Sequence, residues 1–95
     1  MVVNSSGQYI ALSVGKNLIN GIEEIAEIII MMRDPETNEF FVIKNIDMEE
    51  IGMTDMCKQI CFDEKMNESL LFVTKDIVYR FNFFTCKKYK VFDFI

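Results

Sequence analysis

The sequence predicts an all-β protein composed of two four-stranded antiparallel units. Apolar and polar residues alternate in several segments, as in "QYIALSVG" at residues 8–15, and this period of two is typical of a strand. Polar, turn-forming stretches separate these segments. One pattern of residues also occurs twice. It is found in "RDPETNEFFVIKNI", residues 33–46, and again in "FNFFTCKKYKVFDFI", residues 81–95. We therefore expect two similar groups of short strands.

The first unit covers residues 1–46. The opening "MVV" and the strand that follows the turn "NSSG" are predicted to pair as a hairpin over residues 1–15. A tight turn is expected at 34–38, where Pro35 supplies the fixed φ wanted at the second position of a type I turn. The three longer strands of this unit are predicted at residues 8–15, 27–33 and 39–46.

Residues 16–26 are predicted to be an insertion in the first unit, a loop or a short helical turn. An alternative is one helix at about 17–32, packed on an antiparallel sheet in a small α+β domain. The helix would carry one apolar stripe, formed by Leu18, Ile22, Ile25, Ile29 and Met32. Three consecutive β-branched residues at 28–30 favour a strand instead, and Gly21 would cost a helix about 1 kcal/mol relative to Ala.

The second unit covers residues 57–95, and residues 47–56 form an acidic connection to it. Four β-prone segments follow one another in this unit: "CKQICFD", "SLLFVTKD", "IVYRFNFF" and "KYKVFDFI". Four strands in about forty residues, separated by short turns, predict an antiparallel meander.

The two units match without a gap across their third strands and the turns that follow. The matched pairs are Ile29 with Ile77, Ile30 with Val78, Asp34 with Asn82, and Thr37 with Thr85. Each unit then has the order strand, turn, strand, strand, turn, strand over about forty residues. That is the size and order of a β-propeller blade.

This pattern resembles the WD-repeat β-propeller family. Many repeats of that family end their third strand with Trp-Asp, then two residues, then Thr-Gly. "RDPETN" at 33–38 and "FNFFTC" at 81–86 keep the Asp or Asn and the Thr at this spacing, whereas both Trp and both Gly are absent. The family's Gly-His pair ahead of the first strand is also absent, because the chain has no His.

The resemblance implies two degenerate blades, a part of a ring. A blade cannot bury both of its faces alone, so we expect the chain to need protein partners or the remaining blades, and not to be a stable free monomer. The function predicted is a non-catalytic protein–protein interaction scaffold within a larger chain or assembly. The α+β alternative would instead be a small regulatory or ligand-binding subunit.

Composition argues against an enzyme, a metal protein and a nucleic-acid binder. Without His the usual nucleophilic triads cannot form, and Cys57 and Cys61, four residues apart, have no His to complete a zinc site. We predict no catalytic, cofactor-binding or metal-binding residue and no cofactor. The net charge is −5, and the one basic cluster, Lys87, Lys88 and Lys90, is interpreted as a solvated strand edge, so nucleic acid is not an expected partner.

The sequence also bears on location. No apolar run approaches the roughly 20 residues that a membrane-spanning helix needs, and no signal peptide is recognised. Three Cys without an export signal fit reduced thiols. The prediction is a cytoplasmic protein that has no membrane partner.

Overall fold

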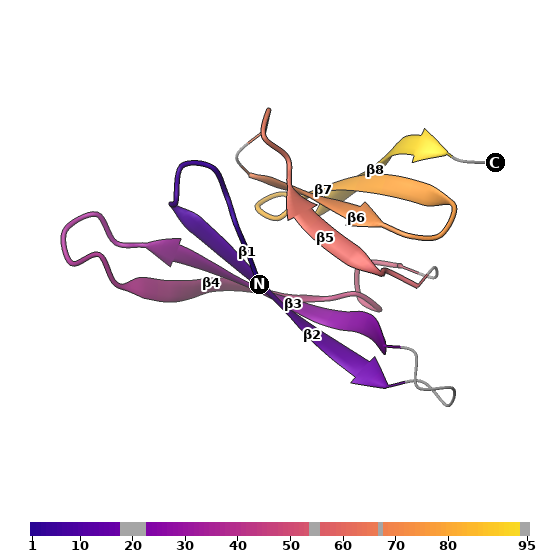
Figure 1. Ribbon diagram of the computed structural model, residues 1–95, viewed down its shortest axis with the longest axis horizontal. Helices are drawn as coiled ribbons and strands as arrows, with labels where there is room; N and C mark the ends of the chain where they lie inside the picture. The colour runs from indigo at the N-terminus through magenta and orange to yellow at the C-terminus, as the bar shows by residue number, and fades with distance from the viewer. Residues whose placement is uncertain (18–22, 54–55, 67, 94–95) are drawn as a thin grey trace.

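The computed structural model is all-β, and it describes residues 1–17, 23–53, 56–66 and 68–93 (Figure 1). Sheet 1 contains β1 (Val2–Val3), β2 (Tyr9–Asn17), β3 (Glu23–Arg33) and β4 (Phe40–Asp47). Sheet 2 contains β5 (Gln59–Phe62), β6 (Ser69–Val73), β7 (Ile77–Asn82) and β8 (Lys87–Asp93). Both sheets are antiparallel meanders, because their strand order follows the chain. The predicted fold class, two four-stranded antiparallel units, is confirmed.

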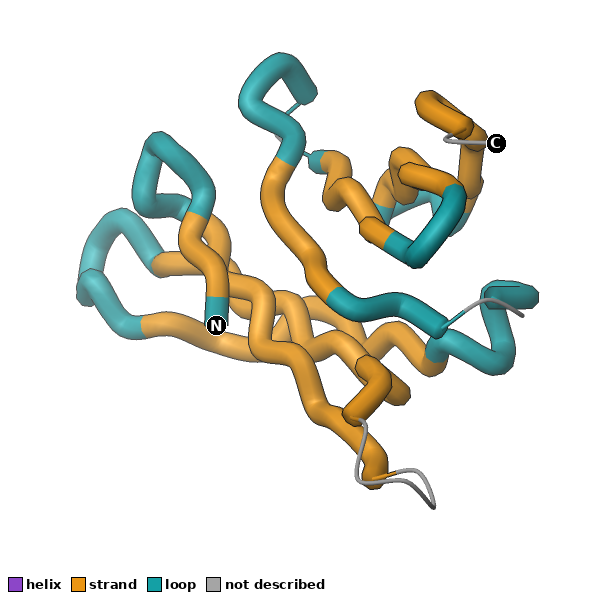
Figure 2. The backbone as a smooth tube through the Cα atoms, turned by 45° about the vertical axis from the view of Figure 1, so that its right-hand side comes forward, coloured by secondary structure: helices purple, strands orange, loops and turns teal. Residues whose placement is uncertain are grey.

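The α+β alternative is wrong. Figure 2 shows only strands and loops in the described part of the chain, and the segment of the proposed helix is extended on both sides of residues 18–22. The expected loop at 16–26 is also wrong in its bounds, because β2 continues to Asn17 and β3 begins at Glu23. Residues 18–22 themselves lie outside the described residues.

A β-bulge in β3 explains why its sequence pattern imitates a helix. Val14 pairs with Glu27 and Gly15 pairs with Ile25, which leaves Ala26 as the extra residue. The bulge shifts the alternation, so that Ile25 and Ile28, three residues apart, both pack on the core. A spacing of three is therefore produced here without a helix.

The predicted hairpin at residues 1–15 is confirmed and is closed by Asn4. Val2 pairs with Ala11, and Val3 pairs with Ile10. The Asn4 side chain is buried, and its Oδ1 accepts the N–H of Tyr9 at 2.9 Å. Gly7 takes a φ of +71° in this turn, a conformation that glycine adopts without steric cost.

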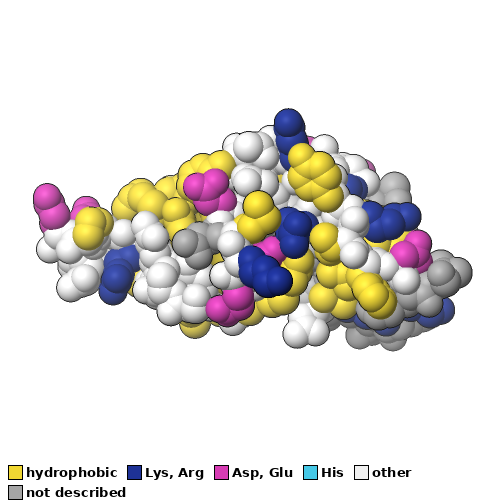
Figure 3. All heavy atoms as spheres, turned by 90° about the horizontal axis from the view of Figure 1, so that it is seen from above, with side chains coloured by type: hydrophobic (Ala, Val, Ile, Leu, Met, Phe, Trp, Pro, Cys, Tyr) yellow, Lys and Arg dark blue, Asp and Glu magenta, His cyan; other side chains and the backbone are white. Residues whose placement is uncertain are grey.

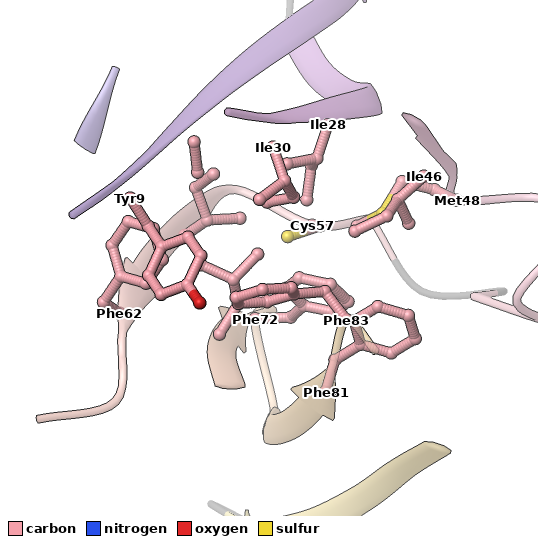
Figure 4. Close-up of a cluster of buried hydrophobic side chains, with 13 residues drawn as sticks. Tyr9, Ile28, Ile30, Ile46, Met48, Cys57, Phe62, Phe72, Phe81 and Phe83 are labelled. Carbon is pink, nitrogen blue, oxygen red and sulfur yellow. The ribbon is translucent and has the colours of Figure 1, made fainter. Parts of the chain in front are cut away.

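The hydrophobic core lies between the two sheets. Sheet 1 and the residue after it contribute Tyr9, Ala11, Ile28, Ile30, Ile46 and Met48, and sheet 2 with its flanks contributes Cys57, Ile60, Phe62, Leu70, Phe72, Phe81 and Phe83. Figure 4 shows the aliphatic side chains of sheet 1 pointing toward the phenyl rings of sheet 2. Phe72 and Phe81 stack at 5.3 Å between centroids, and Tyr9 meets Phe83 edge-on at 5.5 Å. Each fully buried Phe contributes roughly 1.5–3 kcal/mol of transfer free energy.

The sheets approach each other most closely at their first strands. β1 and β5 are the strands from different sheets that contact each other most. In Figure 1 the last strands, β4 and β8, lie far apart. The two sheets therefore diverge from β1 and β5 outward.

The acidic sequence of the segment between the sheets is typical of an exposed connection, but part of this segment is buried. Met48 is buried in the core, and its N–H donates to the carbonyl of Ala26 at the bulge (3.0 Å). The N–H of Ile25 donates to the carbonyl of Cys57 at 3.1 Å. These hydrogen bonds tie the connection to the beginning of β3. In the described part of the chain no helix has the length and apolar character needed to cross a membrane.

Candidate interaction surfaces

The repeated sequence pattern corresponds to a repeated structure, because the β3–β4 turn and the β7–β8 turn have the same hydrogen bonds. The N–H of Glu36 donates to Oδ1 of Asp34, and the N–H of Phe84 donates to Oδ1 of Asn82, each at 2.9 Å. Such Asx turns need a short side chain with an oxygen acceptor, which Asp and Asn both supply. Asp34 and Asn82, a matched pair in the sequence, therefore accept the same hydrogen bond in the two turns.

The likeness extends to the backbone on both sides of the turns. Asn38 and Cys86 both have φ +60°, and each N–H donates at 2.8 Å to the carbonyl of the residue four positions earlier. These are the positions at which the WD-repeat pattern has Gly. The register also shifts at matching places, after Ile30 in the β3–β4 ladder and after Val78 in the β7–β8 ladder.

Residues that match in the two sheets face opposite ways. Met32 in sheet 1 matches Arg80 in sheet 2, and Met31 matches Tyr79. Met32 and Tyr79 pack on the core, whereas Arg80 lines a groove on the other side of sheet 2. We name the side of Met32 and Arg80 the front face of each sheet and the side of Met31 and Tyr79 the back face. The front face of sheet 1 therefore packs on the back face of sheet 2.

This packing is head-to-tail. A two-fold sandwich would bring the same face of each unit together and leave no distinct pair of outer faces. The observed packing leaves the back face of sheet 1 and the front face of sheet 2 uncovered, and these two faces are the candidate interaction surfaces.

One apolar row crosses all four strands on the back face of sheet 1. Val3 pairs with Ile10, Ile10 with Met31, and Met31 with Val42, so one row of side chains crosses the sheet. Val3 is 50% exposed and Val42 55% exposed. Leu12 and Ile29 lie in the next row, which ends in the polar Asn45 on β4, and Val14 at the far end of β2 pairs with Glu27. An apolar row with half-exposed side chains at both ends marks an interaction site or an aggregation hazard.

The front face of sheet 2 is part apolar and part basic. Val73, Val78 and Phe92 form one row, and Leu71, Arg80 and Tyr89 form the next. A groove of about 300 Å³ lies at the turn end of this face, lined by Met66, Ser69, Arg80, Asn82, Thr85, Lys87 and Tyr89. Seen from above, the molecule shows apolar side chains with Lys, Arg, Asp and Glu side chains between them (Figure 3).

An ion pair holds the groove-lining guanidinium in place. The Nε of Arg80 lies 2.7 Å from Oδ2 of Asp63, whose side chain is only 8% exposed. Burial by itself would raise the pKa of the Asp63 carboxyl. The hydrogen bonds from the Lys65 amide and from Arg80, with the positive charges of both residues, outweigh burial and lower this pKa below its ordinary value. Asp63 is therefore ionised at neutral pH.

The basic cluster of the sequence is dispersed by the structure. β8 is the edge strand of sheet 2, as the cluster suggested, but Lys88 is not simply solvated. Its Nζ donates to the carbonyl of Gly52 at 3.1 Å and lies 5.0 Å from the centroid of the Tyr79 ring. Lys90 pairs with Asp93 at 3.6 Å, and Lys87 lines the groove. The three ammonium groups do not converge on one site.

Cys57 and Cys61, the two thiols considered above for a zinc site, lie on opposite faces of sheet 2. Cys57 is in the core, and burial raises the pKa of its thiol to about 11. Cys61 lies in the front-face row that contains Leu71. Both thiols are free. The ion pair of Asp63 and Arg80 was not predicted from the sequence, because its two residues are 17 positions apart along the chain.

Comparison of the chain with family models, with curated proteins and with solved structures found no match. The function is therefore inferred from the two uncovered faces and from the repeated unit.

Proposed function

We propose that this chain is a non-catalytic protein-interaction module, a partial WD-repeat-like propeller piece that works within a larger chain or assembly. One observation carries the proposal. Ile10 and Met31 on the open back face of sheet 1 match Phe72 and Tyr79 in sheet 2, which are covered by sheet 1. The open face thus repeats a face that is covered elsewhere in the same molecule.

The energetics favour a cover for this face. Apolar surface that leaves water contributes roughly 25 cal/mol per Å². Several half-exposed aliphatic side chains in contact therefore supply a driving force for association. A reduced compartment such as the cytoplasm suits the module, in keeping with the free thiols of Cys57, Cys61 and Cys86.

The experiment compares the tagged wild-type chain with Val42→Glu after native purification from the cells that produce it. Size-exclusion chromatography with light scattering should show the wild type in a stoichiometric assembly heavier than the 11.1 kDa chain. Val42→Glu should elute at the mass of one chain with an unchanged β-sheet circular dichroism spectrum. Ser5→Glu, which adds the same charge in the exposed β1–β2 turn, is the matched control and should behave as wild type. A wild-type monomer that binds no apolar dye would contradict the proposal.

A further inference from the structure

We infer that the front face of sheet 2 in one copy of this chain docks on the back face of sheet 1 in a second copy. This inference rests on the proposed function and names the partner. The contact repeats between copies the head-to-tail packing that already joins the two sheets within one chain.

The matched positions carry compatible side chains. On the front face, Leu71, Val73 and Val78 of sheet 2 match Tyr9, Ala11 and Ile30, which make the contact within the chain. These three positions stay apolar on the outer front face, whereas Arg80, which matches the core-packed Met32, adds a charge there. On the back face, Val3, Ile10 and Met31 match Ile60, Phe72 and Tyr79, and these three outer residues are apolar too.

Charge at the turn ends adds complementarity. Within the chain the turn end of sheet 1 lies on the turn end of sheet 2, because Tyr9 contacts Phe83 and Phe84. The same stacking between copies places the groove of Arg80 and Lys87 beside the β3–β4 turn of the next copy. That turn and its flank carry Asp34, Glu36 and Glu39, with Arg33 as the cation among them. Arg80 is already paired with Asp63, so it is the Lys87 ammonium that the groove offers to this mainly acidic turn, and this contact fixes the register of docking.

Symmetry limits what such docking can build. A head-to-tail contact either closes into a ring or continues as a filament. The sheets diverge from β1 and β5 outward. A stack of sheets that repeats this contact therefore curves, and the first strands face the axis of the curve. Propeller rings close with typically four to eight sheets, and each copy supplies two. The expected particle is a closed ring of about two to four copies.

The test uses one variant on each face, both at exposed side chains so that folding is spared. Val42→Glu blocks the back face, and Tyr89→Glu blocks the front face. Light scattering of purified chains should give a ring for the wild type and a monomer for each variant alone. An equimolar mixture of the two variants should give a dimer, a twofold rise in mass, because one intact front face meets one intact back face. A chain that carries both substitutions should stay monomeric.

Other outcomes overturn the inference in distinguishable ways. If Tyr89→Glu alone stays assembled, the copies pair back to back, and if neither variant changes the wild-type particle, the contact lies elsewhere. A wild-type monomer that binds an apolar dye, with binding reduced by Val42→Glu, would overturn copy-to-copy docking but leave the proposed function standing. A wild-type monomer without dye binding would overturn both.

Discussion

Asp63 is a buried carboxylate, and its stability contribution should depend on pH. We expect Asp63→Asn to lower the free energy of unfolding by about 1–3 kcal/mol at pH 7, because it removes a charge-assisted hydrogen bond to Arg80. The folded-state pKa is lowered, so this contribution is present above the unfolded-state pKa of about 4 and is lost as pH falls through the folded-state pKa. Urea titrations from pH 7 down to pH 2 should show the difference between wild type and variant shrinking.

The exposed pair of Lys90 and Asp93 provides the control for that measurement. Asp93→Asn should change the free energy of unfolding by less than about 1 kcal/mol, because a solvent-exposed ion pair contributes little to stability. If the difference in free energy of unfolding between wild type and Asp63→Asn stays constant down to pH 2, the charge of the Asp63 carboxylate is not what stabilises the protein.

Cys86 occupies a backbone conformation that suits glycine. Its φ of +60° costs a residue with a β-carbon roughly 1–2 kcal/mol, so Cys86→Gly is expected to raise the free energy of unfolding by about 1 kcal/mol. Asn38→Gly at the matching position should gain less, since Asn tolerates this region better than Cys does. Thermal unfolding of both variants tests the prediction, and a Cys86→Gly variant less stable than wild type would contradict it.

At the level of single residues, the sequence predicted the turns better than the ion pair. Asp34 and Asn82 could be found because an Asx turn is local and leaves its residues at a fixed spacing. Asp63 and Arg80 meet only after β5, β6 and β7 have paired in register, so no spacing along the chain announces them.

Among the elements, β3 shows where periodicity is ambiguous. Its run of three isoleucines puts apolar side chains on both faces, so neither a period of two nor a period of 3.6 stands out. The bulge at Ala26 adds a spacing of three. The register of β3 is set by β2 and β4 on either side, which is information that a single strand does not contain.

The two faces of sheet 2 should respond differently to the same substitution. Phe72→Ala removes a fully buried ring that stacks on Phe81, and we expect it to lower the free energy of unfolding by about 3–5 kcal/mol. Phe92→Ala removes a ring that is 56% exposed on the front face and should cost clearly less. Denaturant titration, done at concentrations too low for association, compares them. Equal costs for the two variants would contradict the assignment of the core to the back face of sheet 2.

For the whole molecule, the repeat could be predicted but its packing could not. The echo between the two turns revealed the unit. Because both faces of each unit carry apolar residues, the pattern did not reveal which face of sheet 1 would meet which face of sheet 2. The head-to-tail choice became visible only from the burial of Met32 and Tyr79 at non-matching positions.

The proposed copy-to-copy contact should respond to exchanged charges. Lys87→Glu is expected to weaken association by roughly two- to five-fold, in line with the up to about 1 kcal/mol of an exposed ion pair. Adding Glu36→Lys to that variant should restore affinity, because it returns opposite charges to the two turn ends. Sedimentation equilibrium at low ionic strength measures both. A double variant weaker than Lys87→Glu alone would argue against contact between these turns.

Head-to-tail packing of the two matching sheets places the Tyr9 ring against Phe83, so the surroundings of this ring distinguish it from a two-fold sandwich. The ring lies on the front face of sheet 1, 5.5 Å from the Phe83 ring, while Leu71, its own match, lies on the opposite face of sheet 2. A nuclear Overhauser spectrum of isotope-labelled chain should show cross-peaks from Tyr9 to Phe83 and none to the Leu71 methyl groups. Cross-peaks to Leu71 within one chain would mean that matching faces meet in a two-fold sandwich, and they would contradict the account.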